Sequence, residues 1–376
     1  MTEERDALIE AVREFAGAEL APNAARWDTE KHFPIDTLQR AGELGLGGVY
    51  VREKFGGSGL SRFDAVAIFE ELAKGDTTIA AYVSIHNMVA WMIDTFGDAA
   101  QRERWVPGLA AMTALGSYCL TEPGAGSDAA AITTSARRDG DDYVLNGVKQ
   151  FVSGAGSSAV YVVMARTGEP GAKGISAIVV PDGTPGLSFG RNEQKMGWNA
   201  QPTRQVVFDG VRVPVSNRLG AESAGFGIAL KGLDGGRLNI AACSIGGAQW
   251  ALDRALRYVH EREAFGSPLA ANQSIVFTLA DMETELQAAR ALLERAAIKL
   301  DESAPDVVSA CAMAKRFATD AAFNVANTAL QLHGGYGYLH EYGIERVVRD
   351  LRVHQILEGT NEIMRLIVGR NLVSRL

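Results

Sequence analysis

The stretch "TLADMETELQAARALLERAAIKL", residues 278–300, carries the clearest fold signal in the chain. Its apolar positions recur at alternating spacings of three and four residues, as in a long helix of a packed bundle. These positions are Leu279, Met282, Leu286, Ala289, Leu293, Ala296 and Leu300. The pattern predicts a second such helix over residues 306–332. We therefore expect a helical domain of the four-helix type over residues 226–376.

The two parts of the chain that precede this bundle differ in pattern. Residues 1–115 carry helical periods and predict an N-terminal helical domain. Residues 116–225 carry short β-branched runs with turn residues and no helix between them, which predicts a middle antiparallel β domain. In that domain Asn146-Gly147 and Asp209-Gly210 are expected to form two-residue hairpin turns. The predicted fold is mainly α with a central β domain.

Composition narrows the classes of function. The 376 residues suggest two or three packed units. The net charge of −8 speaks against binding of nucleic acid or anionic membrane, and no apolar run approaches the roughly 18 residues of a membrane span. The first ten residues resemble neither a signal nor a transit peptide, so we expect a cytoplasmic location. The three cysteines are far apart and outside any CxxC spacing, which indicates small buried residues.

A first glycine loop, "SYCLTEPGAGSDAAA", covers residues 117–131. Gly124 and Gly126 permit positive φ and close approach of a ligand to the backbone, so a ligand loop and an ordinary loop both remain open. A dinucleotide fold is not indicated, because the third glycine and the strand-turn-helix context are missing.

A second glycine cluster, "QLHGGYGYLHEYGIERVVRD", covers residues 331–350. Gly334 and Gly335 are sufficient to end the preceding helix. His333 and His340 share no helical face, so we expect no metal site. The chain contains no GxSxG, Walker or HExxH motif, and a cofactor would then have to supply the difficult chemistry.

The segment "HQILEGTNEIMRLIVG", residues 354–369, places one glutamate just before a helix that Thr360 or Asn361 can cap. The Glu358 carboxylate could cap the helix by a favourable electrostatic interaction with the free backbone N–H groups at its N-terminus. It could also act as a general base on a loop. The pattern of this segment alone leaves both roles open.

These segments together resemble the acyl-CoA dehydrogenase family, FAD enzymes that desaturate acyl-CoA thioesters between the α and β carbons. The resemblance covers nearly the whole chain, and the family signatures are residues 119–131 and 331–350. Within the family the likeness is to the subgroup acting on isobutyryl-CoA, through "SIHNMVAWMIDTFG", "GWNAQPTRQVVF", "GLDGGRLNIA" and "HQILEGTNEIMR".

This resemblance implies oxidation of a short branched-chain acyl-CoA in valine catabolism, an electron-transferring flavoprotein as electron acceptor, and a homotetramer. Butyryl-CoA or 2-methylbutyryl-CoA is the alternative substrate, since one or two methyl groups discriminate by only about 1–3 kcal/mol. A DNA-binding member of the family is disfavoured by the acidic composition.

The resemblance also implies residue roles. Glu358 matches the catalytic base, and Gly236 occupies the position from which the isovaleryl branch supplies its base. Arg237 beside it is either a cation near the base or part of a helix-surface salt bridge. The implied FAD contacts are Tyr118, Leu120, Thr121, Gly126, Ser127, Phe151, Val152, Ser153, Arg262, Phe265, Gln273, Gln331, Leu332, His333, Gly334, Gly335, Thr360, Asn361 and Glu362. The implied acyl-CoA contacts are Ser127, Asp234, Gly235, Gly236, Arg237 and Arg370.

Overall fold

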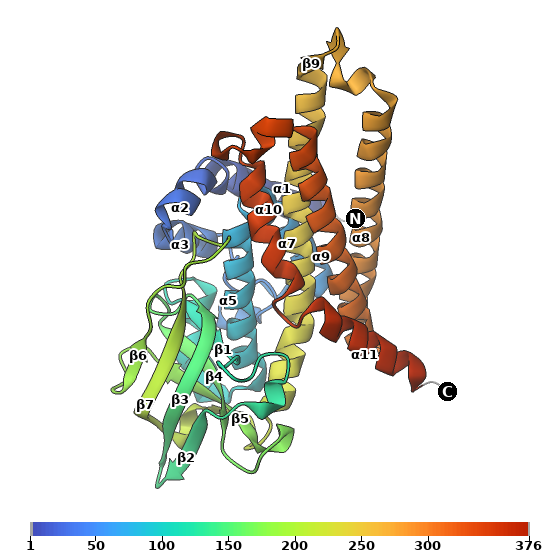
Figure 1. Ribbon diagram of the computed structural model, residues 1–376. Helices are drawn as coiled ribbons and strands as arrows, with labels where there is room; N and C mark the ends of the chain where they lie inside the picture. Colours follow the sequence, from blue (N-terminus) through green and yellow to red (C-terminus); the bar gives the residue numbers. More distant parts are fainter. Residues whose placement is uncertain (1–2, 375–376) are drawn as a thin grey trace.

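The computed structural model describes residues 3–374 and shows a β domain beside two groups of helices (Figure 1). The N-terminal helices are α1 (Glu3–Phe15), continued by a π-helical turn to Leu20, α2 (Ala24–Glu30), α3 (Ile35–Glu43), α4 (Arg62–Gly75), α5 (Thr77–Phe96) and α6 (Ala99–Ala110). The C-terminal helices are α7 (Gly225–Glu261), α8 (Gln273–Asp301), α9 (Val307–Leu332), α10 (Ile344–Arg352) and α11 (Asn361–Val373). A small hairpin of β9 (Glu263–Ala264) and β10 (Ser267–Pro268) joins α7 to α8.

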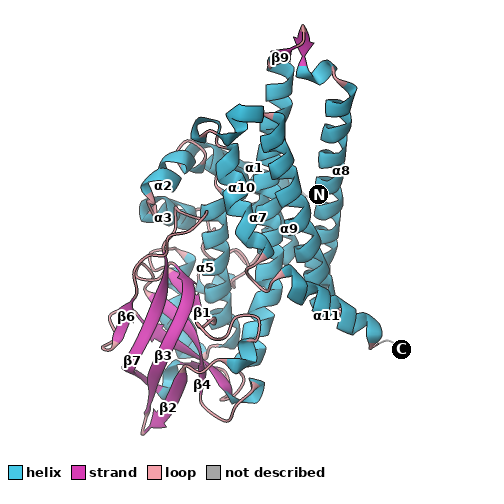
Figure 2. Cartoon of the chain, in the orientation of Figure 1, coloured by secondary structure: helices cyan, strands magenta, loops and turns pink. Residues whose placement is uncertain are grey.

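The middle domain is an eight-stranded sheet, seen at the lower left in Figure 2. Its strands are β1 (Gly116–Cys119), β2 (Ser135–Asp139), β3 (Asp142–Ser153), β4 (Val160–Arg166), β5 (Ile175–Pro181), β6 (Leu187–Phe189), β7 (Thr203–Pro214) and β8 (Arg218–Leu219). The strand order is β6-β7-β3-β2-β4-β5-β8, with β1 beside β4. Most pairings are antiparallel, whereas β1 and β2 each pair with β4 in parallel.

The hairpin turns predicted at Asn146-Gly147 and Asp209-Gly210 are wrong. Both dipeptides lie inside strands, opposite each other, where the pairing of β3 with β7 is irregular. Gly147 and Gly210 have φ of 146° and 64°, and the Gly210 N–H donates to Asn146 Oδ1 at 2.9 Å. A bulge can require the same positive φ as a tight turn, so the dipeptide alone does not distinguish them.

The C-terminal bundle is confirmed, and its core follows the predicted period. On α8, Met282, Leu286, Ala289, Leu293 and Ala296 are buried, and Leu279 and Leu300 are partly buried at the edge of the core. Helix α7 runs through the centre of the molecule and packs against α4, α5, α8 and α9 (Figure 1). This packing places the N-terminal half of α7 beside the β domain and the loop before α11.

Within residues 3–374, no helix combines the length and apolar character that crossing a membrane requires. The same part of the chain contains no group of three or more His, Cys, Asp or Glu side chains arranged to hold a metal ion. Cys119, Cys243 and Cys311 are buried and unpaired with one another.

Candidate active site

Glu358 lies in the loop between α10 and α11, and its backbone has a φ of 58°, a left-handed conformation that is uncommon outside glycine. Its Oε2 atom is buried and has no hydrogen-bond partner within the described residues. The helix cap is instead Thr360, whose side chain accepts from the Ile363 N–H at 3.3 Å. One oxygen of the half-buried Glu358 side chain is therefore buried without a partner among residues 3–374, which capping does not explain.

Gly236 on α7 provides the space that this carboxylate occupies. A Cβ atom at residue 236 would lie 2.1 Å from Glu358 Oε2 and 2.7 Å from its Cδ. Distances under 3.0 Å do not occur for real Cβ contacts, so any larger residue would displace the carboxylate or the helix. The glycine at 236 and the glutamate at 358 are thus sterically linked, although they are far apart in the sequence.

Arg237 and Asp234 form a buried ion pair one turn apart on α7. Arg237 Nη1 donates to Asp234 Oδ1 at 2.7 Å, and Arg237 Nε donates to the backbone oxygen of Glu358 at 3.2 Å. Both side chains are at least nine-tenths buried, so the pair is not the surface salt bridge that the sequence left open. The Arg237 guanidinium instead fixes the loop that carries Glu358.

The surroundings of Glu358 change its protonation. Burial raises the pKa of the Glu358 carboxyl to about 7, while the charges of Arg237 and Lys315 act in the opposite direction. Burial likewise raises the pKa of the Tyr118 hydroxyl, and the negative charge of Glu358 adds to that rise. Because the pKa of Glu358 lies near neutral pH, the carboxyl can both hold and release a proton under ordinary conditions.

The two β-domain segments predicted to contact a flavin lie side by side. Lys149 Nζ donates to the Leu120 carbonyl at 2.9 Å, and the Gln150 N–H donates to the Thr121 carbonyl at 2.8 Å. Beside them, Phe151 has a φ of 57° and is 65 % exposed. An aromatic ring held outward on a strained backbone can serve as a wall for a flat ligand.

The other flavin contacts predicted in the β domain lie in the same two segments, residues 117–131 and 151–153. Tyr118 is half-buried, and its hydroxyl has no partner in the part of the chain that the structure describes. Gly126 and Ser127 are exposed. Neither Gly124 nor Gly126 has the positive φ that the sequence suggested, but no described atom lies where their Cβ would stand. Val152 is buried and Ser153 is half-buried, next to Phe151.

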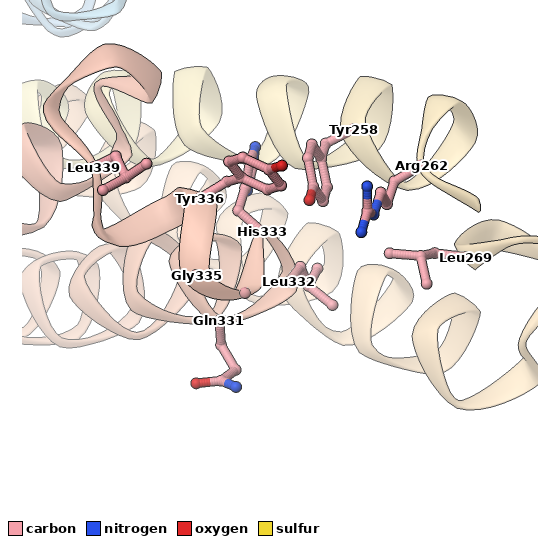
Figure 3. Close-up of a pocket in the computed structure, with 10 residues that line it drawn as sticks. Tyr258, Arg262, Leu269, Gln331, Leu332, His333, Gly335, Tyr336 and Leu339 are labelled. Carbon is pink, nitrogen blue, oxygen red and sulfur yellow. The ribbon is translucent and has the colours of Figure 1, made fainter. Parts of the chain in front are cut away.

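A pocket of about 420 Å³ lies at the opposite end of α7, where Arg262, Tyr258 and Leu269 face the loop that follows α9 (Figure 3). Of the predicted cofactor residues, Arg262 and residues 331–335 line this pocket. The Gln331 side chain points away from the rings in Figure 3, whereas His333 stacks on Tyr258 with ring centroids 4.4 Å apart. The open space over Gly334 and Gly335 leaves their backbone accessible to a ligand.

Several predicted residues lie outside this pocket. Phe265 is fully exposed at the β9–β10 hairpin, with a φ of 55°, and Gln273 is exposed at the start of α8. Asn361 is buried beside α9, and Glu362 is exposed on the first turn of α11. Arg370 is exposed near the end of α11 and lines a groove of about 460 Å³ on that helix.

Two aromatic residues of the pocket, Tyr258 and Tyr336, were not among the predicted contacts. Tyr258 lies one helical turn before Arg262, so the helical period alone could have placed it on the same face. Tyr336 stands within the second glycine cluster, and its side chain lines the pocket (Figure 3).

Comparisons with known proteins agree with this arrangement. Three family models match the chain: the acyl-CoA dehydrogenase N-terminal domain over residues 2–113, the middle domain over 117–211 and the C-terminal domain over 223–373. The mitochondrial isobutyryl-CoA dehydrogenase of Bos taurus is 52% identical over 373 residues, covering 99% of this chain and 90% of the relative.

Solved structures agree as well. The butyryl-CoA dehydrogenase of Megasphaera elsdenii matches with a TM-score of 0.96 and 39% identity, over 99% of both chains. A chain from a structure of the electron transferring flavoprotein of Acidaminococcus fermentans matches with a TM-score of 0.97 and 39% identity, covering 99% of this chain and 98% of that one. The chain therefore belongs to the acyl-CoA dehydrogenase family, whose members are flavin-dependent oxidoreductases.

Proposed function

We propose that the protein is a FAD-dependent dehydrogenase of short branched-chain acyl-CoA thioesters that converts isobutyryl-CoA to methacrylyl-CoA in valine catabolism. The observation that carries the proposal is the Glu358 carboxylate, whose Oε2 atom is buried, without a partner in the described part of the chain, in the space that Gly236 leaves on α7. The 52% identity to a bovine isobutyryl-CoA dehydrogenase supports the choice of substrate.

In this proposal Glu358 removes the α-proton of the thioester. An α-proton is a weak acid, so the base and the donors around the thioester oxygen must act together. The backbone N–H of Glu358 is a candidate donor to that oxygen, as the family resemblance implies. When bound, FAD would supply an acceptor for the hydride that leaves the β-carbon. Bound substrate would displace water from around Glu358, which strengthens the electrostatic interactions inside the site.

The residues of this chain support two separate contact regions for FAD. The first is the wall formed by Leu120, Thr121 and Phe151, in the same region as Tyr118, on which the charge of Glu358 acts. The second is the pocket of Arg262 at the far end of α7. Gly236 and Tyr258 are separated by 22 residues of α7, which corresponds to roughly 33 Å. This separation exceeds the length of an extended FAD, so we propose that a second copy of the chain supplies the pocket. A homotetramer, as the family resemblance implies, would satisfy this requirement.

We also propose that the electrons pass to an electron-transferring flavoprotein, because a solved structure of such a system contains a chain similar to this one. A cytoplasmic location remains a prediction, and the bovine relative is named as mitochondrial. Neither point affects the chemistry proposed at Glu358.

The proposal is tested by anaerobic bleaching of the flavin near 450 nm with a set of thioesters. Purified FAD-loaded protein should bleach fastest with isobutyryl-CoA and more slowly with butyryl-, 2-methylbutyryl- and isovaleryl-CoA. Fastest bleaching by butyryl-CoA or 2-methylbutyryl-CoA would keep the dehydrogenase and replace the substrate. No bleaching by any short acyl-CoA would refute the proposed function.

A further inference from the structure

Lys315 on α9 is fully buried, and its ammonium faces the loop that carries Glu358. Lys315 Nζ donates to the Gly359 carbonyl at 2.8 Å and to Asn361 Oδ1 at 2.9 Å. A buried ammonium is costly unless its donors are matched, so such an arrangement is retained only where it is well partnered. No sequence motif indicated this residue, and no step proposed above uses it.

The loop that Lys315 contacts requires support. Glu358 and Gly359 are both in the left-handed region, with φ of 58° and 91°. A non-glycine residue persists there only where surrounding contacts determine its conformation. Two cations supply such contacts on successive carbonyls: Arg237 at the Glu358 oxygen, at 3.2 Å, and Lys315 at the Gly359 oxygen, at 2.8 Å.

The second partner of Lys315 ties the same loop to α9. Asn361 accepts from Lys315 through Oδ1 and donates through Nδ2 to Thr319 Oγ1 at 2.9 Å and to Asp320 Oδ1 at 2.7 Å. Lys315 and Thr319 lie about one turn apart on α9, and Asp320 follows Thr319, so neighbouring residues of this helix hold the start of α11. The helix thereby fixes the position at which the Glu358 loop ends.

We propose that Lys315 is a positioning residue for Glu358. Its ammonium holds the Gly359 carbonyl and the Asn361 side chain in place, and its positive charge favours the ionised form of the Glu358 carboxylate. The role rests on the proposed function, because Glu358 is taken as the base.

The charges around the loop are consistent with this role. Burial raises the pKa of Glu358 to about 7, and Arg237 and Lys315 are the cations whose charges lower it. Burial in turn lowers the pKa of Lys315 to about 8, and the charge of Glu358 opposes that change. Asp320 and Glu362 raise the pKa of Lys315, whereas Arg237, which is paired with Asp234, lowers it. The charge of Glu358 in turn raises the pKa of Tyr50, Tyr118 and Cys243, which lie around it.

The test is the pH dependence of flavin reduction in the FAD-loaded enzyme, for Lys315→Met, Lys315→Arg and Lys173→Met. Lys315→Met should move the acid limb of the profile upward by about one pH unit and lower the rate at pH 7 about fivefold, because the ionised fraction of Glu358 falls from about one half to about one tenth. Lys315→Arg retains the charge and should keep the limb near the wild-type position. Lys173 is exposed in the β domain, and its substitution removes one charge without touching the loop.

A second measurement separates this inference from the proposed function. Isotope-edited infrared titration of the Glu358 carboxyl requires no substrate, so it reports on Lys315 even if isobutyryl-CoA fails to bleach the wild type. If Lys315→Met unfolds, Lys315→Gln retains polar donors without the charge and is titrated in its place. An unchanged titration of Glu358 in the neutral variants, with an unchanged rate, would overturn the role of Lys315.

Discussion

Substitution of Gly236 by alanine tests whether the Glu358 carboxylate acts from the position seen in the structure. The new Cβ would lie 2.1 Å from Glu358 Oε2, whereas ordinary contact begins at 3.4 Å. The carboxylate must therefore move by at least about 1.3 Å, and a misplacement of about 1 Å costs on the order of 10²-fold in rate. We expect Gly236→Ala to lower the rate of flavin reduction about 100-fold.

The same substitution should leave the fold nearly unchanged. The clashing atom is the far end of a flexible side chain, and alanine is favoured over glycine in a helix interior by about 0.5–1 kcal/mol. The free energy of unfolding should thus stay within about 1 kcal/mol of the wild type. A loss of activity without a loss of stability distinguishes displacement of the base from general damage.

The assay is stopped-flow flavin bleaching by isobutyryl-CoA, with urea unfolding of the same samples. Gly227→Ala is the matched control, because Gly227 is on the same helix and no described atom lies within 4 Å of its Cβ position. The control should react at the wild-type rate. Near-wild-type bleaching by Gly236→Ala would refute the reasoning, since the carboxylate would then not need the space at residue 236.

Three further predictions concern protonation and cofactor binding. Because the pKa of Glu358 is raised to about 7, the rate of flavin reduction should fall about tenfold per pH unit below that value. At pH 5.5 only about 3 % of the base is ionised. A rate that stays constant down to pH 5 would contradict this prediction. The raised pKa also means that the neutral form favours folding and that this stability is lost as pH rises from about 4.5 to about 7. Glu358→Gln should therefore stabilise the cofactor-free protein by about 3 kcal/mol at pH 8 and hardly at all at pH 4, measured by urea unfolding. Phe151→Ala should weaken FAD binding about tenfold in a fluorescence titration, whereas the equally exposed Phe277 on α8 should tolerate alanine without that effect.

Helix periods were readable from the sequence because they depend on local spacing. Residues 278–300 follow their predicted apolar positions closely, since one helix face packs against one core. The hairpin predictions at the two glycine dipeptides were wrong because a bulge and a hairpin turn can both require a positive φ. Only the pairing with the partner strand distinguishes the two. Sheet pairing is a tertiary property, which a local pattern does not contain.

The candidate site was likewise predictable only where the signal is local. Glu358 and Gly236 could be proposed from family resemblance, but their contact joins segments about 120 residues apart and emerges only from the packing of α7. Lys315 was missed because a lysine in an amphipathic helix is usually solvated, and its burial against Gly359 depends on tertiary structure. Tyr258 and His333 come together for the same reason.

The most direct test of the central claim is anaerobic flavin reduction by isobutyryl-CoA in Glu358→Gln, compared with the wild type. The variant retains the size of the side chain but cannot accept the α-proton. We expect it to bind the thioester, seen as a perturbation of the flavin spectrum, and to be reduced roughly 10²–10⁴-fold more slowly. Reduction at the wild-type rate would show that the base lies elsewhere and would contradict the account.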